Sequence, residues 1–72
     1  MKNTKDIILN QVFLLRMATI SQLSEILAIS EISVRHHLMS LEAEGIIAST
    51  EERHGVGRPR FVYHLTEKGF QN

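Results

Sequence analysis

The 72-residue sequence contains no cysteine and no long apolar run. Without thiols the chain has no disulfide, thiolate metal site, iron–sulfur ligand or cysteine nucleophile, and the reducing cytoplasm is its expected location. The longest apolar-rich stretch, residues 7–20, is interrupted by Asn10, Gln11 and Arg16. It falls short of the about 20 apolar residues that cross a bilayer, and it lacks the cleavage site of a secretory signal. No membrane association is therefore expected.

The sequence also lacks an excess of charge of either sign, with eight Lys and Arg against eight Asp and Glu. A zero net charge argues against nucleic-acid binding, because phosphate contacts need basic side chains. The average conceals an uneven distribution, since the segment from residue 53 to residue 65 contains no acid. Its basic side chains make it a candidate for phosphate contacts: Arg53, His54, Arg58, Arg60 and His64.

Motifs of catalysis are missing as well. The sequence has no P-loop, no Cys–His or Ser–His–Asp arrangement and no carboxylate pair in an expected pocket. The G-V-G-R-P run, residues 55–59, is too short for a dinucleotide-binding loop. His36 and His37 are adjacent, so they do not share a helix face, and a histidine pair at i, i+4 with a carboxylate is missing. We therefore expect no enzyme, no catalytic residue, no cofactor and no metal site.

The first helix is predicted over residues 4–16. Asn3 or Thr4 can cap its start, and Ile8, Val12 and Leu15 recur at the i, i+4, i+7 spacing of a core stripe. A second apolar stripe exceeds what one small core needs, and this surplus predicts a homodimer that forms through the first helix. The stripe consists of Leu9, Phe13 and Met17.

A helix-turn-helix is predicted over residues 19–44. Thr19 and Gln22 match a capping box that starts a second helix near residue 20, and Ser30 can cap a third helix that runs from about residue 31 to 44. Gly45 then favours a left-handed C-terminal cap. The expected core residues are Leu23, Ile26 and Leu27 in the second helix and Val34, Leu38 and Leu41 in the third.

A β-hairpin is predicted over residues 46–65. Its strands cover residues 46–50 and 61–65, and a Gly- and Pro-containing loop joins them.

Residues 18–20 are a candidate short strand, and Thr66 can cap a last turn before Gly69. A chain of this length buries only about 60% of its unfolded surface, so we expect one domain, residues 1–72. The order predicts an α+β, mainly α, winged helix-turn-helix: a three-helix bundle with a small antiparallel β-hairpin wing.

Three runs carry a resemblance to known regulators: A-T-I-S-Q-L-S-E-I-L-A-I-S-E-I-S-V-R-H-H-L at 18–38, S-L-E-A-E-G-I-I at 40–47 and G-R-P-R-F-V-Y-H-L-T-E-K-G at 57–69. They resemble bacterial and archaeal winged-helix repressors of the MarR, ArsR and DeoR type, and the N-terminal DNA-binding domain of SufR-like regulators. The resemblance implies a transcriptional regulator, expected to be a repressor, with double-stranded DNA as its partner. Ala28 stands where the family often has glycine, and the cluster-binding domain of SufR-like proteins has no counterpart here.

The third helix is the predicted reader of the DNA major groove. At about 100° per residue, the direction opposite its core stripe points outward through His36, and the N-terminal part of a recognition helix contacts base edges. Arg35 lies to the side, where a guanine edge and a phosphate are both within its range. An outward apolar side chain at Ile32 is explained either by contact with a thymine methyl group or by incidental exposure or subunit packing. The candidate residues on this helix are Ser30, Ile32, Ser33, Arg35, His36 and Ser40.

The wing is the second candidate DNA contact, through Arg53, Arg58 and Arg60. The Gly57-Arg58-Pro59 run resembles the core of AT-hook peptides, in which an extended arginine enters the minor groove, and narrow A·T-rich grooves attract such an arginine. The alternative is a flexible hairpin tip with a solvated arginine. For the whole chain, the alternative function is a winged-helix protein-interaction module without DNA binding. No small-molecule effector is evident in either case.

Overall fold

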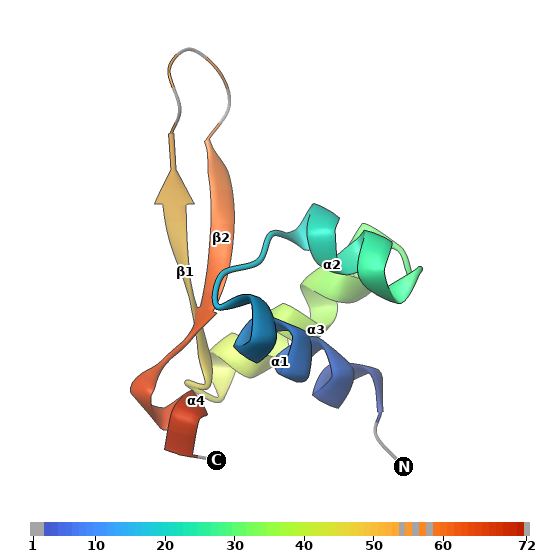
Figure 1. Ribbon diagram of the computed structural model, residues 1–72, viewed down its shortest axis with the longest axis vertical. Coiled ribbons are helices and arrows are strands. Elements are labelled where there is room, and N and C mark those ends of the chain that lie inside the picture. Colours follow the sequence, from blue (N-terminus) through green and yellow to red (C-terminus); the bar gives the residue numbers. More distant parts are fainter. Residues whose placement is uncertain (1–2, 54, 56, 58, 72) are drawn as a thin grey trace.

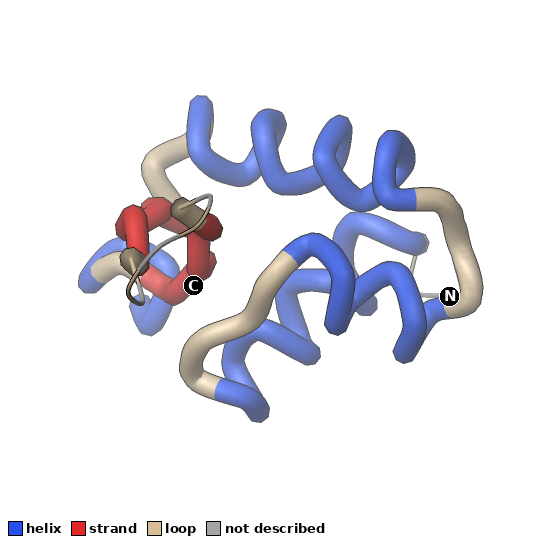
Figure 2. The backbone as a smooth tube through the Cα atoms, turned by 90° about the horizontal axis from the view of Figure 1, so that it is seen from above, coloured by secondary structure: helices blue, strands red, loops and turns tan. Residues whose placement is uncertain are grey.

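Three helices, a two-stranded hairpin and a short last helix follow one another along the chain (Figure 1). The computed structural model describes residues 3–53, 55, 57 and 59–71. The elements are α1 (Thr4–Leu15), α2 (Ile20–Leu27), α3 (Glu31–Ala43), β1 (Ile47–Glu52), β2 (Arg60–Leu65) and α4 (Glu67–Gln71). The hairpin projects past the helices, and Figure 2 shows it end-on beside them. The predicted α+β, mainly helical, winged-helix class is confirmed.

Each of the first three helices begins at a polar side chain that accepts a backbone N–H. Asn3 accepts the N–H of Asp6 at 2.9 Å, and Ser30 accepts the N–H of a residue three positions on at 3.1 Å. At α2 the predicted capping box is present, with Thr19 Oγ1 and Gln22 Oε1 each accepting the other residue's N–H, at 3.1 and 2.9 Å. Such caps stabilise a helix by about 1 kcal/mol each.

The turn between α2 and α3 has a left-handed residue. Ala28 lies at φ 57° and ψ 43°, and the N–H groups of Ala28 and Ile29 both bind the carbonyl of Ser24. The hydroxyl of Ser24 donates back to the Ile29 carbonyl at 2.6 Å. An alanine in this conformation costs about 1–2 kcal/mol, so the short turn holds a strained residue in place.

The core lies where α1, α2 and α3 meet the base of the hairpin. Its largest fully buried side chains are Ile8, Val12, Leu23, Val34, Leu38 and Leu41. Two predicted core positions are wrong: Ile26 is 50% exposed and Leu15 is 42% exposed. In α2, Leu23 is fully buried, and the partly buried Ile20 and Leu27 lie to one side of it. At about 100° per residue, Ile26 lies about 60° from Leu23 on the other side, so it faces away from the core. Leu15 is the last residue of α1.

The hairpin is antiparallel, with a register that runs from Ile47 opposite Leu65 to Glu52 opposite Arg60. Both strands are longer than predicted, so Glu52 and Arg60 lie in paired strands rather than in the loop. The expected strand at 18–20 is a single bridge, in which Ala18 and Tyr63 exchange backbone hydrogen bonds of 3.0 and 2.7 Å. It stops there because Thr19 already caps α2.

The last helix closes the C-terminal end of α3. Lys68 Nζ donates to the carbonyl of Glu44 at 2.8 Å, and the hydroxyl of Thr66 donates to that of Gly45. A cation at this end of a helix also interacts favourably with the helix dipole. Gly69, expected after the last turn, lies inside α4. A Cβ atom at this position would approach the backbone oxygen of Ile46 to less than 3.0 Å, so the close packing here requires glycine. Among the described residues, no helix is long and apolar enough to span a membrane.

Candidate nucleic-acid interface

The outer face of α3 and its N-cap carry the six residues that the sequence predicts as DNA contacts of this helix, and all six are exposed. On its inner side α3 contacts α1, α2 and β1, and its buried residues Val34, Leu38 and Leu41 lie there. In Figure 2, α3 runs along one side of the helices and leads into the hairpin. Ile32 is 72% exposed in the first turn, so no core contact explains an apolar side chain at this position.

Tyr63 connects α3, the hairpin and the segment between α1 and α2, and sequence reasoning missed it. Its backbone pairs with Ala18, and its side chain is buried in the core. Burial raises the pKa of Tyr63, the charge of Glu42 on α3 raises it further, and Arg35 lowers it. Glu42 also accepts a hydrogen bond from the hydroxyl of Ser49 at 3.3 Å. The charges of Arg35 and Glu42 on α3 thus both act on Tyr63 of the hairpin, in opposite directions.

The wing arginines have acidic partners, which corrects the premise that no acid is near them. Arg53 Nε donates to Glu51 at 2.8 Å, and Arg60 donates to Glu52 at 3.3 and 3.4 Å. The acids belong to β1, outside the acid-free segment of sequence. The strand register brings Glu52 beside Arg60, whereas Glu51 is only two residues from Arg53 along the chain. Arg58 lies outside the described residues.

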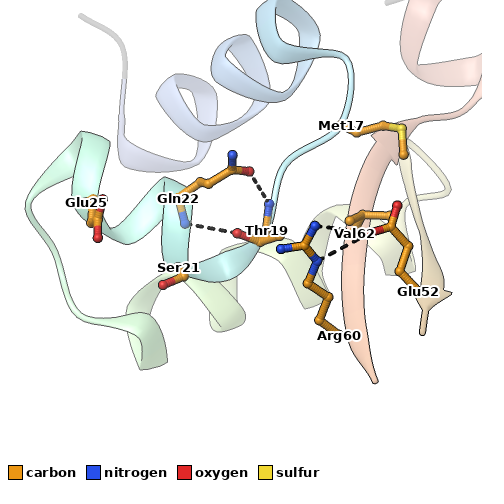
Figure 3. A pocket seen from close by; sticks show the side chains of 8 residues that line it. All are labelled: Met17, Thr19, Ser21, Gln22, Glu25, Glu52, Arg60 and Val62. Carbon is orange, nitrogen blue, oxygen red and sulfur yellow. Dashed lines mark hydrogen bonds and ion pairs between the residues drawn. The ribbon is translucent and has the colours of Figure 1, made fainter. Parts of the chain in front are cut away.

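A shallow groove separates the first turn of α2 from the hairpin (Figure 3). Thr19 and Ser21 line one wall, and Glu52, Arg60 and Val62 line the other. The groove combines a helix N-terminus, which is partially positive, with the guanidinium of Arg60. The groove is also lined by the carboxylates of Glu25 and Glu52, so a negatively charged group there would have to take the place of Glu52 as the partner of Arg60. The signal in the sequence is the capping box, which places the start of α2, but the approach of Arg60 depends on the fold.

His64, one of the basic side chains of the acid-free segment, is half-buried and has partners. Its Nε2 lies 3.2 Å from the hydroxyl oxygen of Thr50, and it lines a surface hollow beside Val12 and Phe13 of α1. Because α1 packs against β2, it covers part of this face of the hairpin. Among the described residues, no three His, Asp or Glu side chains gather as metal ligands.

The sequence model of the transcriptional regulator PadR-like family matches residues 15–72. The chain belongs to this family. The regulator class predicted from the sequence is thereby confirmed, and the prediction that the chain is not an enzyme agrees with it. Placement among MarR, ArsR, DeoR or SufR-like proteins is not confirmed. No curated protein sequence matches the chain.

Solved structures of regulators share the fold. A MarR-like transcriptional regulator from Thermotoga maritima is 28% identical with a TM-score of 0.76, over 99% of this chain and 49% of that one. A PadR family regulator from Eggerthella lenta is 25% identical with a TM-score of 0.73, over 90% and 62%. Bacillus subtilis PadR in complex with operator DNA is 19% identical with a TM-score of 0.73, over 90% and 42%. The chain thus spans less than two thirds of each of these three proteins.

Proposed function

We propose that residues 1–72 are a winged-helix domain that binds double-stranded DNA in a sequence-specific way and acts in transcriptional regulation. In this proposal α3 enters the major groove, and the wing contacts the minor groove or the phosphates. The observation that carries it is the outer face of α3, where short polar side chains, Arg35 and His36 are exposed together beside the projecting hairpin. The PadR-like family and the operator complex of the Bacillus subtilis protein support DNA binding over a protein-interaction module.

Within this proposal the first turns of α3 read base edges through Ser30, Ile32, Ser33 and His36. The high exposure of Ile32 supports a contact with a thymine methyl, because the major groove presents this group at A·T pairs. Arg35 reaches a guanine edge or a phosphate, and Ser40 lies near the backbone. On the wing, the proposed contacts are Arg53, Arg58 and Arg60.

A titration with random-sequence duplex DNA at two salt concentrations tests the proposal. Phosphate contacts release counterions, so the binding constant is expected to fall steeply as salt rises. Binding that is undetectable at low salt would favour the alternative, a winged helix that binds protein. The base-reading role of α3 predicts that Ser33→Ala changes the preference between duplex sequences by about 1–3 kcal/mol. Equal weakening on every sequence would contradict that role.

We further propose a homodimer that forms through α1. Phe13, Leu14 and Met17 are 52%, 62% and 49% exposed, and Phe70 of α4 packs edge-on against Phe13 at a centroid distance of 6.0 Å. Sedimentation equilibrium is expected to show a dimer that Leu14→Glu dissociates, whereas Ile26→Glu on α2, 50% exposed in the wild type, leaves it intact. A wild-type chain that stays monomeric at all concentrations would overturn this proposal.

The mode of regulation proposed is repression, in the cytoplasm and without a small-molecule effector. A domain that occupies an operator in the major groove blocks other proteins from the same DNA, and the absence of cysteine suits a reducing compartment. A reporter gene placed behind a selected binding site should be less active when the chain is expressed. Higher reporter activity would indicate an activator.

A further inference from the structure

Both described arginines of the wing are held by carboxylates of β1, and this arrangement bears on the specificity of the proposed DNA binding. Glu51 and Glu52 are consecutive, so their side chains point to opposite faces of the hairpin. Glu51 pairs with Arg53, two residues further along the same face, and Glu52 pairs with Arg60, its direct partner across the strands. Among the described residues of the wing, each face therefore has one arginine and one carboxylate.

These ion pairs are open to exchange. The side chains of Arg53 and Arg60 are 74% and 63% exposed, and exposed ion pairs contribute only about 0–1 kcal/mol. A DNA phosphate can therefore take the place of the carboxylate as the partner of each arginine. Figure 3 shows Arg60 beside the first turn of α2, where a phosphate in the groove would meet it.

The carboxylate remains close to the phosphate after such an exchange. Glu51 and Glu52 are fixed on β1 by the backbone pairing of the hairpin, so each stays within reach of its arginine. Like charges repel, and the three arginines of the wing share it with two carboxylates. The net positive charge of the wing is therefore lower, and it releases fewer counterions from DNA, because release follows the positive charge brought to the phosphates. The wing then adds less affinity that is independent of sequence than three arginines without carboxylates would.

We propose that Glu51 and Glu52 are specificity-determining residues, which limit the affinity of the wing for the DNA backbone so that binding depends on the contacts of α3. The inference rests on the proposed DNA binding. Non-specific affinity is almost entirely electrostatic, and the genome offers a large excess of non-specific sites. A lower affinity of the wing for the DNA backbone thus leaves more of the protein free to bind the sites that α3 reads.

The test measures binding of random-sequence duplex over a range of salt concentrations for the wild type, Glu51→Gln, Glu52→Gln and the double variant. Glutamine keeps the size and hydrogen-bonding capacity of the side chain and removes its charge. The salt slope is expected to steepen by up to about one unit per substitution. When salt is lowered from 1 M to 0.1 M, the binding constant of the double variant should therefore rise by up to about 100-fold more than that of the wild type. The matched control is Glu67→Gln in α4, which removes the same charge at the opposite end of the hairpin and should leave the slope unchanged.

A second pair of variants separates this role from a general effect of net charge. Arg60→Gln should lower the salt slope by about one unit in the Glu52→Gln background and by clearly less in the wild type, because Glu52 there offsets the arginine. An equal effect in both backgrounds would overturn the proposal, and so would a double variant that binds as weakly as the wild type or more weakly. If neither the wild type nor any variant binds duplex at low salt, the proposed function itself fails. Melting curves of each variant confirm that it is folded.

Discussion

The substitution Gly69→Ala places a methyl group against the backbone of the hairpin. A Cβ atom at this position would lie 3.0 Å from Leu65 Cδ2 and 3.3 Å from Ile46 Cγ2, and closer still to the carbonyl oxygen of Ile46. That oxygen already accepts the N–H of Thr66 at 2.9 Å, and the hydroxyl oxygen of Thr66 lies 3.1 Å from it. The carbonyl therefore has little freedom to move, and α4 must shift away from the end of α3.

The expected loss of stability follows from three contributions. Overpacking costs about 1–3 kcal/mol, and a weakened hydrogen bond to Ile46 adds about 1 kcal/mol. The better helix propensity of alanine offsets about 1 kcal/mol. The net destabilisation is about 2 kcal/mol, which lowers the melting temperature of a domain this small by about 8–16 °C.

Thermal unfolding followed by circular dichroism checks this value. The control is Gln71→Ala, an exposed position of the same helix, which should change the free energy of unfolding by no more than about 0.5 kcal/mol. A Gly69→Ala variant as stable as the wild type, or more stable, would refute the argument that Gly69 is required by the close approach of α4 to the hairpin.

Three further predictions concern the turn, the cap and the core. Ala28→Gly relieves the left-handed strain and should raise the free energy of unfolding by about 0.5–1 kcal/mol; an unchanged urea midpoint would contradict it. Thr19→Ala removes one half of the capping box and should lower stability by about 1 kcal/mol, with Ser21→Ala as the exposed control. Because burial raises the pKa of Tyr63 above 10.0, the stability from its neutral phenol is complete below about pH 10 and is lost as pH rises through the higher folded pKa. Tyr63→Phe should therefore lose less stability than the wild type on going from about pH 9 to 11, and equal losses would contradict this.

The helices were predictable because their ends are encoded locally. Thr19 with Gln22, Ser30 and Gly45 each act within a few residues, and the sequence places the start of α2 and both ends of α3 to within one residue of their observed positions. Ile26 was misplaced because α2 has only eight residues. Over so short a helix, the apolar spacing is compatible with two directions of burial, and only packing against α1 and α3 chooses between them.

The candidate site was predictable on α3 and less so on the wing. The outer face of a helix follows from the positions of its core residues, so the exposure of Ser33, Arg35 and His36 could be foreseen. The partner of Arg60 depends on the strand register, which a single sequence does not specify when the loop length is uncertain. Glu51 lies two residues before Arg53, just outside the acid-free segment, so this pair follows from local sequence. An acid-free segment in the sequence is therefore compatible with paired arginines in the fold.

Selection of bound duplexes from a random-sequence pool tests the central claim most directly, when the wild type and His36→Ala are compared side by side. If α3 reads bases, the wild type enriches a defined sequence, and His36→Ala relaxes or changes that sequence at one position while phosphate-driven binding persists. Enrichment of no sequence by the wild type, or of the same sequence with the same strength by both proteins, would contradict the claim that the outer face of α3 reads DNA through His36.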